Sequence, residues 1–147
     1  MFQKLKSRLL YSMYKFSIST KGNNDIIDIT PQVIEQVKKT EVKEGVCLIS
    51  CSGSTCGITT IEYEPNLIRD FKEFLEKLAP RDKKYYHDET WGEKNGYSHL
   101  LSALFKPFLT VPIENGELAL GTWQQIVFCD FDSRPRRRKV LVKIIKN

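Results

Sequence analysis

Long apolar segments and nucleotide-binding loops are both absent from this sequence. No stretch approaches the roughly 18 apolar residues of a membrane-spanning helix. The small-residue loop at 52–57 can bring backbone amides close to an anion. It lacks the lysine and the spacing of a P-loop, however, and a plain turn is the simpler interpretation. The sequence therefore excludes a helical membrane protein and does not support a P-loop nucleotide-binding protein.

Cysteine is present, but not in the pattern of a paired motif. None of the four cysteines, at positions 47, 51, 56 and 129, belongs to a Cys-x-x-Cys pair. Cys47 and Cys51 lie in an extended run, where four residues span about 13 Å at the rise of a strand, too far for a disulfide. We therefore expect reduced, mostly buried thiols and a cytoplasmic protein. Zinc ligation by Cys56 or Cys129 stays open as an alternative.

Histidine is scarce, and its two copies lie close together in the sequence. His87 and His99 are twelve residues apart in a loop-like stretch that also contains Asp88, Glu89 and Asn95. Neutral imidazole is a common metal ligand and moves protons near neutral pH, so two converging histidines beside carboxylates would make a metal or acid-base site. The alternative is that they are unrelated surface residues, because their spacing matches neither a helical His-x-x-x-His pair nor a zinc-finger repeat.

The length of 147 residues is typical of one domain with a single core. The basic N-terminal stretch predicts an exposed extension over 1–12, followed by one domain over 13–147. Strand-like alternation and helical apolar spacing both occur along this domain. The expected strands are 14–21, 26–29, 46–51, 58–64, 108–113, 118–120, 124–132 and 140–145, and the expected helices are 31–41, 67–79 and 98–105.

Four local features refine this prediction. Thr30 before Pro31 is typical of a capped helix start, and Asn115-Gly116 is typical of a tight hairpin turn. The nearly continuous apolar run 46–51 predicts a strand covered on both faces. Pro112 predicts an edge or a bulge in the strand 108–113.

A basic run, Arg134-Pro135-Arg136-Arg137-Arg138-Lys139, is the most charged part of the sequence. If residues 133–136 form a hairpin bend, Asp132 faces Arg137 and Asp130 faces Lys139 across the two strands. Arg134, Arg136 and Arg138 are then left without a counter-ion. Arginines near a turn suit a bidentate phosphate clamp, and Arg136 and Arg138 are the predicted clamp residues. A nucleic-acid surface needs a broader patch with interleaved aromatic residues, so RNA binding is the less favoured interpretation.

Several short motifs together resemble the YjbQ-like family, also called the secondary thiamine-phosphate synthase family. They are Gly-Ser-Thr with Thr-Thr-Ile-Glu-Tyr-Glu-Pro within 53–65, Tyr-His-Asp at 86–88, Ser-His at 98–99, Leu-Thr-Val-Pro at 109–112, Leu-Gly-Thr-Trp-Gln at 120–124 and Asp-Phe-Asp with Arg-Pro-Arg within 130–136. The resemblance covers nearly everything from residue 14 onward. It implies an α+β fold with two packed, sandwich-like β-sheets of about seven strands and two or three helices, assembled as a homotrimer. It also implies a polar pocket that uses His87 and His99, and a secondary ability to make thiamine phosphate.

The sequence departs from the family pattern at four places. Tyr97 stands where many relatives have a histidine, and Leu101 stands where a lysine or arginine is usual. The stretch 106–108 replaces a glycine-containing loop, and Ser54 takes the place of a histidine found in another branch. Losing a base and a cation favours an alternative class, a non-catalytic trimer that holds a metal or a phosphorylated ligand.

The functional hypothesis joins the residues with the resemblance. The catalytic set is His87, His99, Asp88 and Glu62, with Asp88 orienting a histidine and the two histidines able to bind a divalent metal, zinc or magnesium. The predicted ligand-binding set for a small phosphorylated molecule is Thr122, Trp123, Gln124, Arg136 and Arg138. Trp123 is equally consistent with packing, and Gln124 with a strand-end cap.

Overall fold

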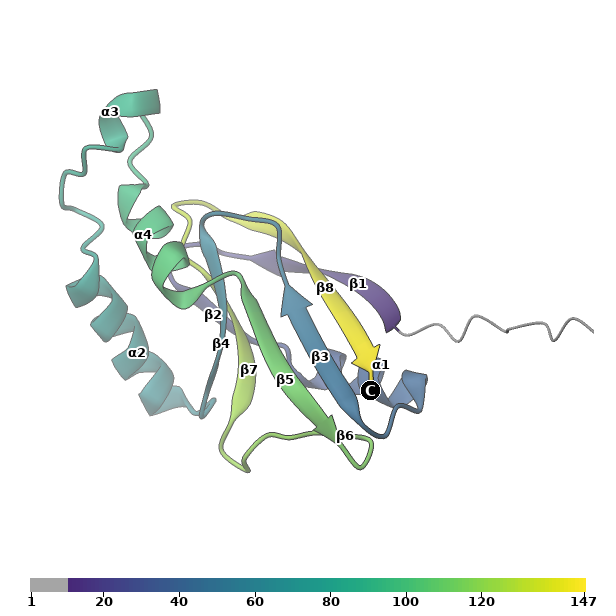
Figure 1. Cartoon of the computed structure of the whole chain (residues 1–147). Coiled ribbons are helices and arrows are strands. Elements are labelled where there is room, and N and C mark those ends of the chain that lie inside the picture. Colours follow the sequence, from purple (N-terminus) through teal and green to yellow (C-terminus); the bar gives the residue numbers. More distant parts are fainter. Residues whose placement is uncertain (1–10) are drawn as a thin grey trace, which may run out of the picture.

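The computed structural model describes residues 11–147 and shows two antiparallel β-sheets flanked by helices (Figure 1). The larger sheet has the strand order β1-β8-β3-β5-β6, and the smaller has the order β2-β7-β4. The described residues contain eight strands and four helices, close to the expected numbers. The predicted α+β class with two packed sheets is confirmed.

Most element boundaries lie within a few residues of the predicted ones, but the last strand begins earlier than predicted and the short helix at 88–91 was not predicted. The strands are β1 (Tyr11–Thr20), β2 (Asp25–Asp28), β3 (Gly45–Ser50), β4 (Cys56–Ile61), β5 (Phe108–Glu114), β6 (Glu117–Leu118), β7 (Gln125–Asp130) and β8 (Arg136–Lys146). The helices are α1 (Thr30–Thr40), α2 (Pro65–Leu78), α3 (Asp88–Trp91) and α4 (Gly96–Phe105). The first strand begins at Tyr11, inside the stretch predicted as an extension; the rest of that extension lies outside the described residues.

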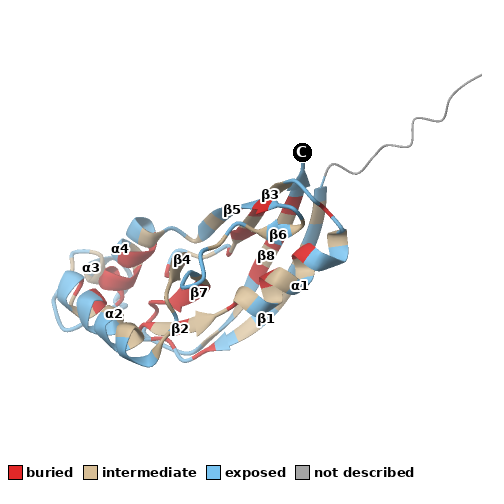
Figure 2. Ribbon diagram, turned by 90° about the horizontal axis from the view of Figure 1, so that it is seen from below, coloured by how far each residue is buried: buried red, intermediate tan, exposed pale blue. Residues whose placement is uncertain are grey.

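The main core lies between the two sheets. Ile49 of β3 and Val142 of β8 pack against Phe128 of β7, and Val33 of α1 joins the same cluster. A second core forms on the opposite face of the small sheet, where Leu75 of α2 and Leu101 of α4 cover β7. Figure 2 shows the buried residues gathered on β3, β7, β8 and α4. The layers are therefore the large sheet, the small sheet, and the helices α2 and α4, whereas α1 packs at the core between the sheets.

One face of the large sheet has no covering layer among residues 11–147. Cys47 and Ile49 of β3 point into the core, whereas their neighbours on the other face are only half-buried. On that outer face Met13 is 53% exposed and Phe108 is 52% exposed. The expectation that 46–51 would be covered on both faces is therefore wrong for the single chain.

Turn residues confirm one prediction and correct another. Asn115 and Gly116 have φ angles of +52° and +82°, as a tight primed turn requires, and they join β5 to β6. Thr30 does not cap α1. Its hydroxyl accepts a hydrogen bond from Ile126 N at 2.8 Å, so it ties the helix start to β7 instead.

The largest correction concerns the basic run. Strands β7 and β8 do not form a hairpin, because β7 belongs to the small sheet and β8 to the large one. The connection between them crosses from one sheet to the other, so Asp130 and Asp132 do not face Lys139 and Arg137. Instead β8 pairs with β1 and β3, and Arg138 lies opposite Ile18.

Candidate functional site: a histidine pair beside α4

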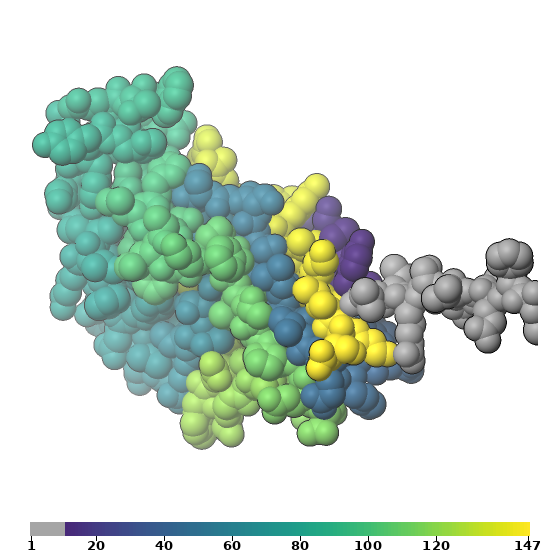
Figure 3. Space-filling model, viewed as in Figure 1, coloured from purple at the N-terminus to yellow at the C-terminus, as the bar shows by residue number. Residues whose placement is uncertain are grey.

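His87 and His99 come together in the folded chain. His87 immediately precedes α3, and His99 lies in the first turns of α4. Their ring centroids are 4.5 Å apart with the ring planes at 65°, an edge-to-face contact. Both side chains are half-buried, so each ring keeps a face or edge open to a guest. The space-filling view shows this region, residues 80–100, projecting from one end of the molecule (Figure 3).

Asp88 and Gly96 hold the loop in this shape. The Asp88 carboxylate accepts hydrogen bonds from Tyr85 N and Gly96 N, both at 3.1 Å. A Cβ on Gly96 would lie 2.5 Å from the Tyr85 Cβ, so only glycine permits the close approach of the two chain segments. The hydrogen bond from Tyr85 N, helped by those from Gly96 and Asn95 and by nearby His87, lowers the pKa of Asp88. Asp88 therefore braces the loop backbone that brings the rings together, and it does not hydrogen-bond an imidazole.

The histidines form only part of a metal site. Catalytic zinc is usually held by three protein ligands. Within residues 11–147, no third histidine, cysteine or carboxylate joins His87 and His99 in a metal-binding group. The two histidines thus supply one ligand fewer than catalytic zinc usually has, and a bound zinc or magnesium ion stays a prediction.

Glu62 does not join the histidines. It follows β4, whose first residue, Cys56, accepts a hydrogen bond from Ser102 of α4 at 2.6 Å. The strand then runs about 17 Å away from α4 before Glu62 is reached. This predicted catalytic carboxylate consequently lies at the opposite end of the small sheet.

The predicted ligand-binding residues of the 120–124 motif also lie at that far end. Thr122, Trp123 and Gln124 form the turn before β7 and are exposed. The side chain of Gln124 accepts a hydrogen bond from Gly121 N at 3.0 Å and donates one to Thr60 Oγ1 at 3.2 Å. Gln124 thus acts as the strand-end cap that the sequence left open, and Trp123, 71% exposed, does not pack in a core.

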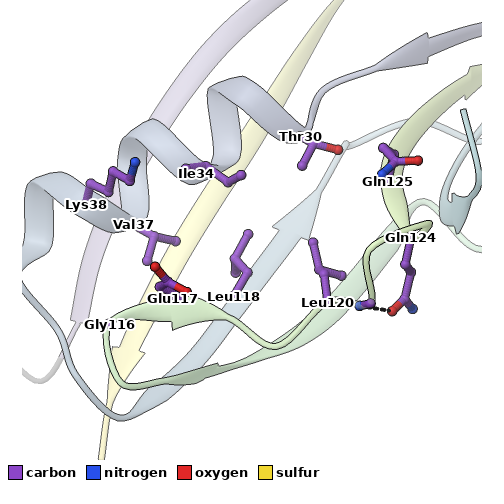
Figure 4. A pocket seen from close by; sticks show the side chains of 11 residues that line it. Thr30, Ile34, Val37, Lys38, Gly116, Glu117, Leu118, Leu120, Gln124 and Gln125 are labelled. Carbon is purple, nitrogen blue, oxygen red and sulfur yellow. Dashed lines mark hydrogen bonds between the residues drawn. The ribbon is translucent and has the colours of Figure 1, made fainter.

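A cavity of about 340 Å³ opens beside this turn, between α1 and the β6–β7 connection (Figure 4). Ile34, Leu118 and Leu120 give it an apolar floor, and Lys38 and Gln125 stand at its polar rim. The sequence did not predict this cavity, because its lining comes from segments that are distant along the chain. It is separate from the histidine pair.

The two arginines predicted to clamp a phosphate are already neutralised. Arg138 donates from Nε and Nη2 to both carboxylate oxygens of Asp130, each at 2.8 Å, and from Nη2 to Thr55 at 2.8 Å. Arg136 donates to Asp132 from Nε at 2.9 Å and from Nη2 at 2.8 Å. Asp130 and Asp132 are fully buried. The predicted phosphate clamp is therefore corrected to a structural ion-pair network that joins the two sheets.

The sequence contains the spacing of aspartates and arginines that underlies this network, but the predicted hairpin gave these residues the wrong partners. Arg136 and Arg138 alternate on one face of β8, and the aspartates have the same two-residue spacing, with Asp130 at the end of β7 and Asp132 just beyond it. Burial alone would raise the pKa of Asp132, but hydrogen bonds from Arg136, Thr55 and Ser133 outweigh it and lower the pKa. Thr20 adds a bond to Asp130 at 2.6 Å.

Both departures from the family pattern in α4 face the core. Tyr97 and Leu101 are buried with α2 in the second core, and the Tyr97 ring lies 6.5 Å from that of Tyr85. Burial raises the pKa of Tyr97, and Asp132 is near enough to act in the same direction. Packing in the core therefore occupies the two positions where the resemblance implies a base and a cation.

The cysteines behave largely as expected. All four are free and buried, and they form no metal-binding group with histidines or carboxylates in the described part of the chain.

None of the helices between residues 11 and 147 has both the length and the hydropathy of a membrane span.

Comparison with known proteins agrees with this architecture of two antiparallel sheets and flanking helices. The family model described as UPF0047 protein YjbQ-like matches residues 14–147. A UPF0047 protein of Archaeoglobus fulgidus is 40% identical over 131 residues, covering 89% of this chain and 99% of the relative. One from Methanocaldococcus jannaschii is 37% identical over 134 residues, covering 90% and 94%.

Solved structures give the same result. A YjbQ/UPF0047 protein of Clostridium acetobutylicum superposes with a TM-score of 0.81 at 37% identity, covering 90% of this chain and 99% of that one. A YbjQ-like protein of Sulfolobus solfataricus gives a TM-score of 0.84 at 27% identity, covering 93% and 99%. The chain belongs to the YjbQ-like UPF0047 family.

Proposed function

We propose that this chain is a small-molecule transferase of the thiamine-phosphate synthase type, working in the cytoplasm as a homotrimer. It would join a pyrimidine pyrophosphate to a thiazole phosphate beside His87 and His99. The supporting observation is the contact between these two imidazoles, with ring centroids 4.5 Å apart, in a loop braced by Asp88. The nitrogen atoms of the two rings can donate or accept hydrogen bonds and so suit a charged ligand.

The reaction makes modest demands on the protein. The thiazole nitrogen attacks the methylene carbon of the pyrimidine, a carbon–nitrogen bond forms, and the carbon–oxygen bond to pyrophosphate breaks with its electrons going to the leaving oxygen. Positioned hydrogen-bond donors must stabilise the negative charge that builds on pyrophosphate. His87 and His99 would supply such donors. Arg134, exposed in the β7–β8 turn and outside the ion-pair network, is the better cation than Arg136 or Arg138.

In the proposed trimer, a neighbouring chain would cover the exposed sheet face and contribute to the histidine site. The outer face of the large sheet exposes Met13 and Phe108, and apolar surface of this kind is often covered by another subunit. A neighbouring chain could also add a third ligand to the histidine pair. Sedimentation of the purified protein at several concentrations would measure the assembly, and a stable monomer would contradict this part of the proposal.

A non-catalytic binder of a phosphorylated ligand or a metal is the second candidate. Two observations favour it: Tyr97 and Leu101 fill the core at positions where the resemblance led us to expect a base and a cation, and the charge of Arg138 is paired with Asp130. The binder would hold its ligand beside the histidines and release it unchanged.

One experiment separates the two candidates. The protein is mixed with pyrimidine pyrophosphate and thiazole phosphate, thiamine phosphate is followed by chromatography, and binding of each substrate is measured by calorimetry. Product formation that falls at least about tenfold in both His87→Ala and His99→Ala supports the transferase. Lys94→Ala, an exposed residue of the same region, is the matched control and should keep full activity.

The opposite results are equally informative. Substrate binding without product, lost in the histidine variants, supports the binder and rules out the enzyme. Binding and turnover that are both unchanged in His87→Ala and His99→Ala would remove the histidine pair from either function. Metal analysis of protein purified without chelator, repeated on the two variants, tests whether the assembled protein holds zinc or magnesium at this place.

A further inference from the structure

A second chemically distinctive cluster lies where β3 leads into β4. The loop 51–55 carries the chain from the large sheet to the small one, and a cysteine stands at each end of it. A Cβ built on Gly53 would lie 3.1 Å from Cys56 Sγ, 3.9 Å from Cys51 Sγ and 3.3 Å from Arg138 Nη1. The two sulfurs and the guanidinium therefore converge beneath Gly53, a position where any side chain would crowd them.

One nitrogen of the Arg138 guanidinium is not used in the ion-pair network. Nε and Nη2 of Arg138 are occupied by Asp130 and Thr55. Nη1 takes part in none of these bonds and is the atom nearest to Gly53. A fixed positive charge beside a thiol favours the thiolate, which is the reactive form of cysteine.

The two thiols are not equivalent. A hydrogen bond from Cys56, assisted by Arg138, lowers the pKa of Cys51 against the opposing effects of burial and Asp130. The same bond and burial raise the pKa of Cys56. By contrast, burial alone raises the pKa of Cys47 to about 12, and burial also raises that of Cys129. The electrostatics therefore single out Cys51 as the thiolate and Cys56 as its proton-bearing neighbour.

Cys51 is 7% exposed and lies beside a cavity at the surface. It lines a cavity of about 430 Å³ between β1, β3 and β8, together with two serines. The cations Lys15, Arg137 and Lys139 line the same cavity, and no aspartate or glutamate is among its lining residues. A basic entrance of this kind raises the local concentration of anions and stabilises a thiolate at its base.

We propose that Cys51 and Cys56 form a peroxide-reactive thiol site, with Cys51 as the nucleophile and Cys56 as the resolving cysteine. The Cys51 thiolate attacks the terminal oxygen of a hydroperoxide; the O–O bond breaks, and the alkoxide or hydroxide that leaves takes a proton. Cys51 becomes a sulfenic acid. Cys56 then attacks this sulfur, an S–S bond forms, and the hydroxyl leaves as water with the Cys56 proton. Two thiols are oxidised by two electrons and one peroxide bond is reduced.

The first test uses the intact protein and hydrogen peroxide. After graded exposure, free thiols are alkylated under denaturing conditions and the peptides are mapped by mass spectrometry. We expect a Cys51–Cys56 disulfide to appear first, with Cys47 and Cys129 still alkylated. Oxidation of all four cysteines at similar rates, or no disulfide between 51 and 56, would overturn the proposal.

Two variants separate the roles. Cys56→Ser should leave a sulfenic acid at Cys51 that dimedone traps, whereas Cys51→Ser should protect Cys56 from oxidation. Dimedone labelling at Cys56 in Cys51→Ser would reverse the assignment and so refute it. Because a buried substitution can destabilise the protein, the wild-type comparison of Cys51 with Cys47 stands as an independent test.

The basic entrance is tested by reagent charge. Native wild-type protein is alkylated with iodoacetate, an anion, and with iodoacetamide, which is neutral. The rate of Cys51 alkylation by iodoacetate, divided by the rate with iodoacetamide, should fall several-fold in Lys139→Ser, because one cation of the entrance is lost. Lys143→Ser is the matched control, since Lys143 lies on the same face of β8 but does not line the cavity. An unchanged ratio in Lys139→Ser would contradict the role of the cavity. None of these outcomes depends on the histidine pair or on thiamine phosphate.

Discussion

The histidine pair and the arginine pair show how differently two sets of charged or polar residues can be used in one fold. Arg136 and Arg138 donate from Nε and Nη2 to the buried carboxylates of Asp132 and Asp130, so their charge is paired inside the protein. His87 and His99 contact each other in a half-buried loop, and a carboxylate braces the backbone around them. A candidate site needs groups that can still form hydrogen bonds with a ligand. Of these two sets of residues, the histidines meet that requirement better.

The largest effect should come from Arg138→Met. Asp130 is fully buried, and removing its partner leaves an uncompensated carboxylate in the protein interior. We expect a loss of about 3–5 kcal/mol in the free energy of unfolding, measured by urea denaturation. Arg137→Met, one residue away on the exposed face, should change it by no more than about 0.5 kcal/mol. Equal small effects would show that the arginine pair is not structural.

Arg136→Met should have an intermediate effect that depends on pH. At pH 7 we expect a loss of about 1–3 kcal/mol, because Asp132 loses a charged hydrogen-bond donor. The pKa of Asp132 is lowered in the folded protein, so its stabilisation is present above the unfolded value of about 3.9 and is lost as the pH falls through the folded value. The unfolding curves of wild type and variant should therefore converge in acid. A difference that stays constant from pH 7 to pH 3 would contradict this assignment.

On the histidine side, Asp88→Ala should act locally. The amides of Tyr85 and Gly96 lose their acceptor and should exchange with deuterium faster, on the order of tenfold. Glu89→Ala is the control, because Glu89 is exposed and bonds Lys84. Imidazole NMR signals should shift in Asp88→Ala alone. No change in exchange would mean that another contact holds the loop.

The smallest effect on stability should come from His87→Ala and His99→Ala. Neither ring is buried in a core, so we expect each variant to unfold within about 0.5 kcal/mol of wild type. Urea denaturation gives the measurement. A loss as large as that for Arg138→Met would show that the pair is structural, and the contrast between the two sets of residues would disappear.

Local elements were the part of the fold most accessible to prediction. Pro31 and the apolar spacing after it placed a helix at 31–41, and the structure has it at Thr30–Thr40. Asn115-Gly116 predicted the turn that joins β5 to β6. These signals act over a few residues, where backbone sterics and the period of side chains decide the outcome.

Partners across the fold were harder to predict. The alternation in 134–139 correctly implies two faces, but it does not say in which sheet β8 finds its neighbours. A hairpin between β7 and β8 gave Asp132 the wrong partner and left Arg138 free. The separation of Glu62 and Trp123 from the histidines was likewise invisible, because no local pattern reports the distance between opposite ends of a sheet.

The sequence alone was enough to predict the helix at 31–41, the tight turn at Asn115-Gly116 and the two histidines as candidates, since each follows from short-range geometry or composition. The class of fold came from the motifs that resemble the YjbQ-like family. Folding in three dimensions decided that the imidazoles touch, that the arginines are neutralised and that Cys51 and Cys56 meet beside a guanidinium. Those outcomes depend on which sheet each strand joins, and that choice is made by burying apolar faces over the whole chain.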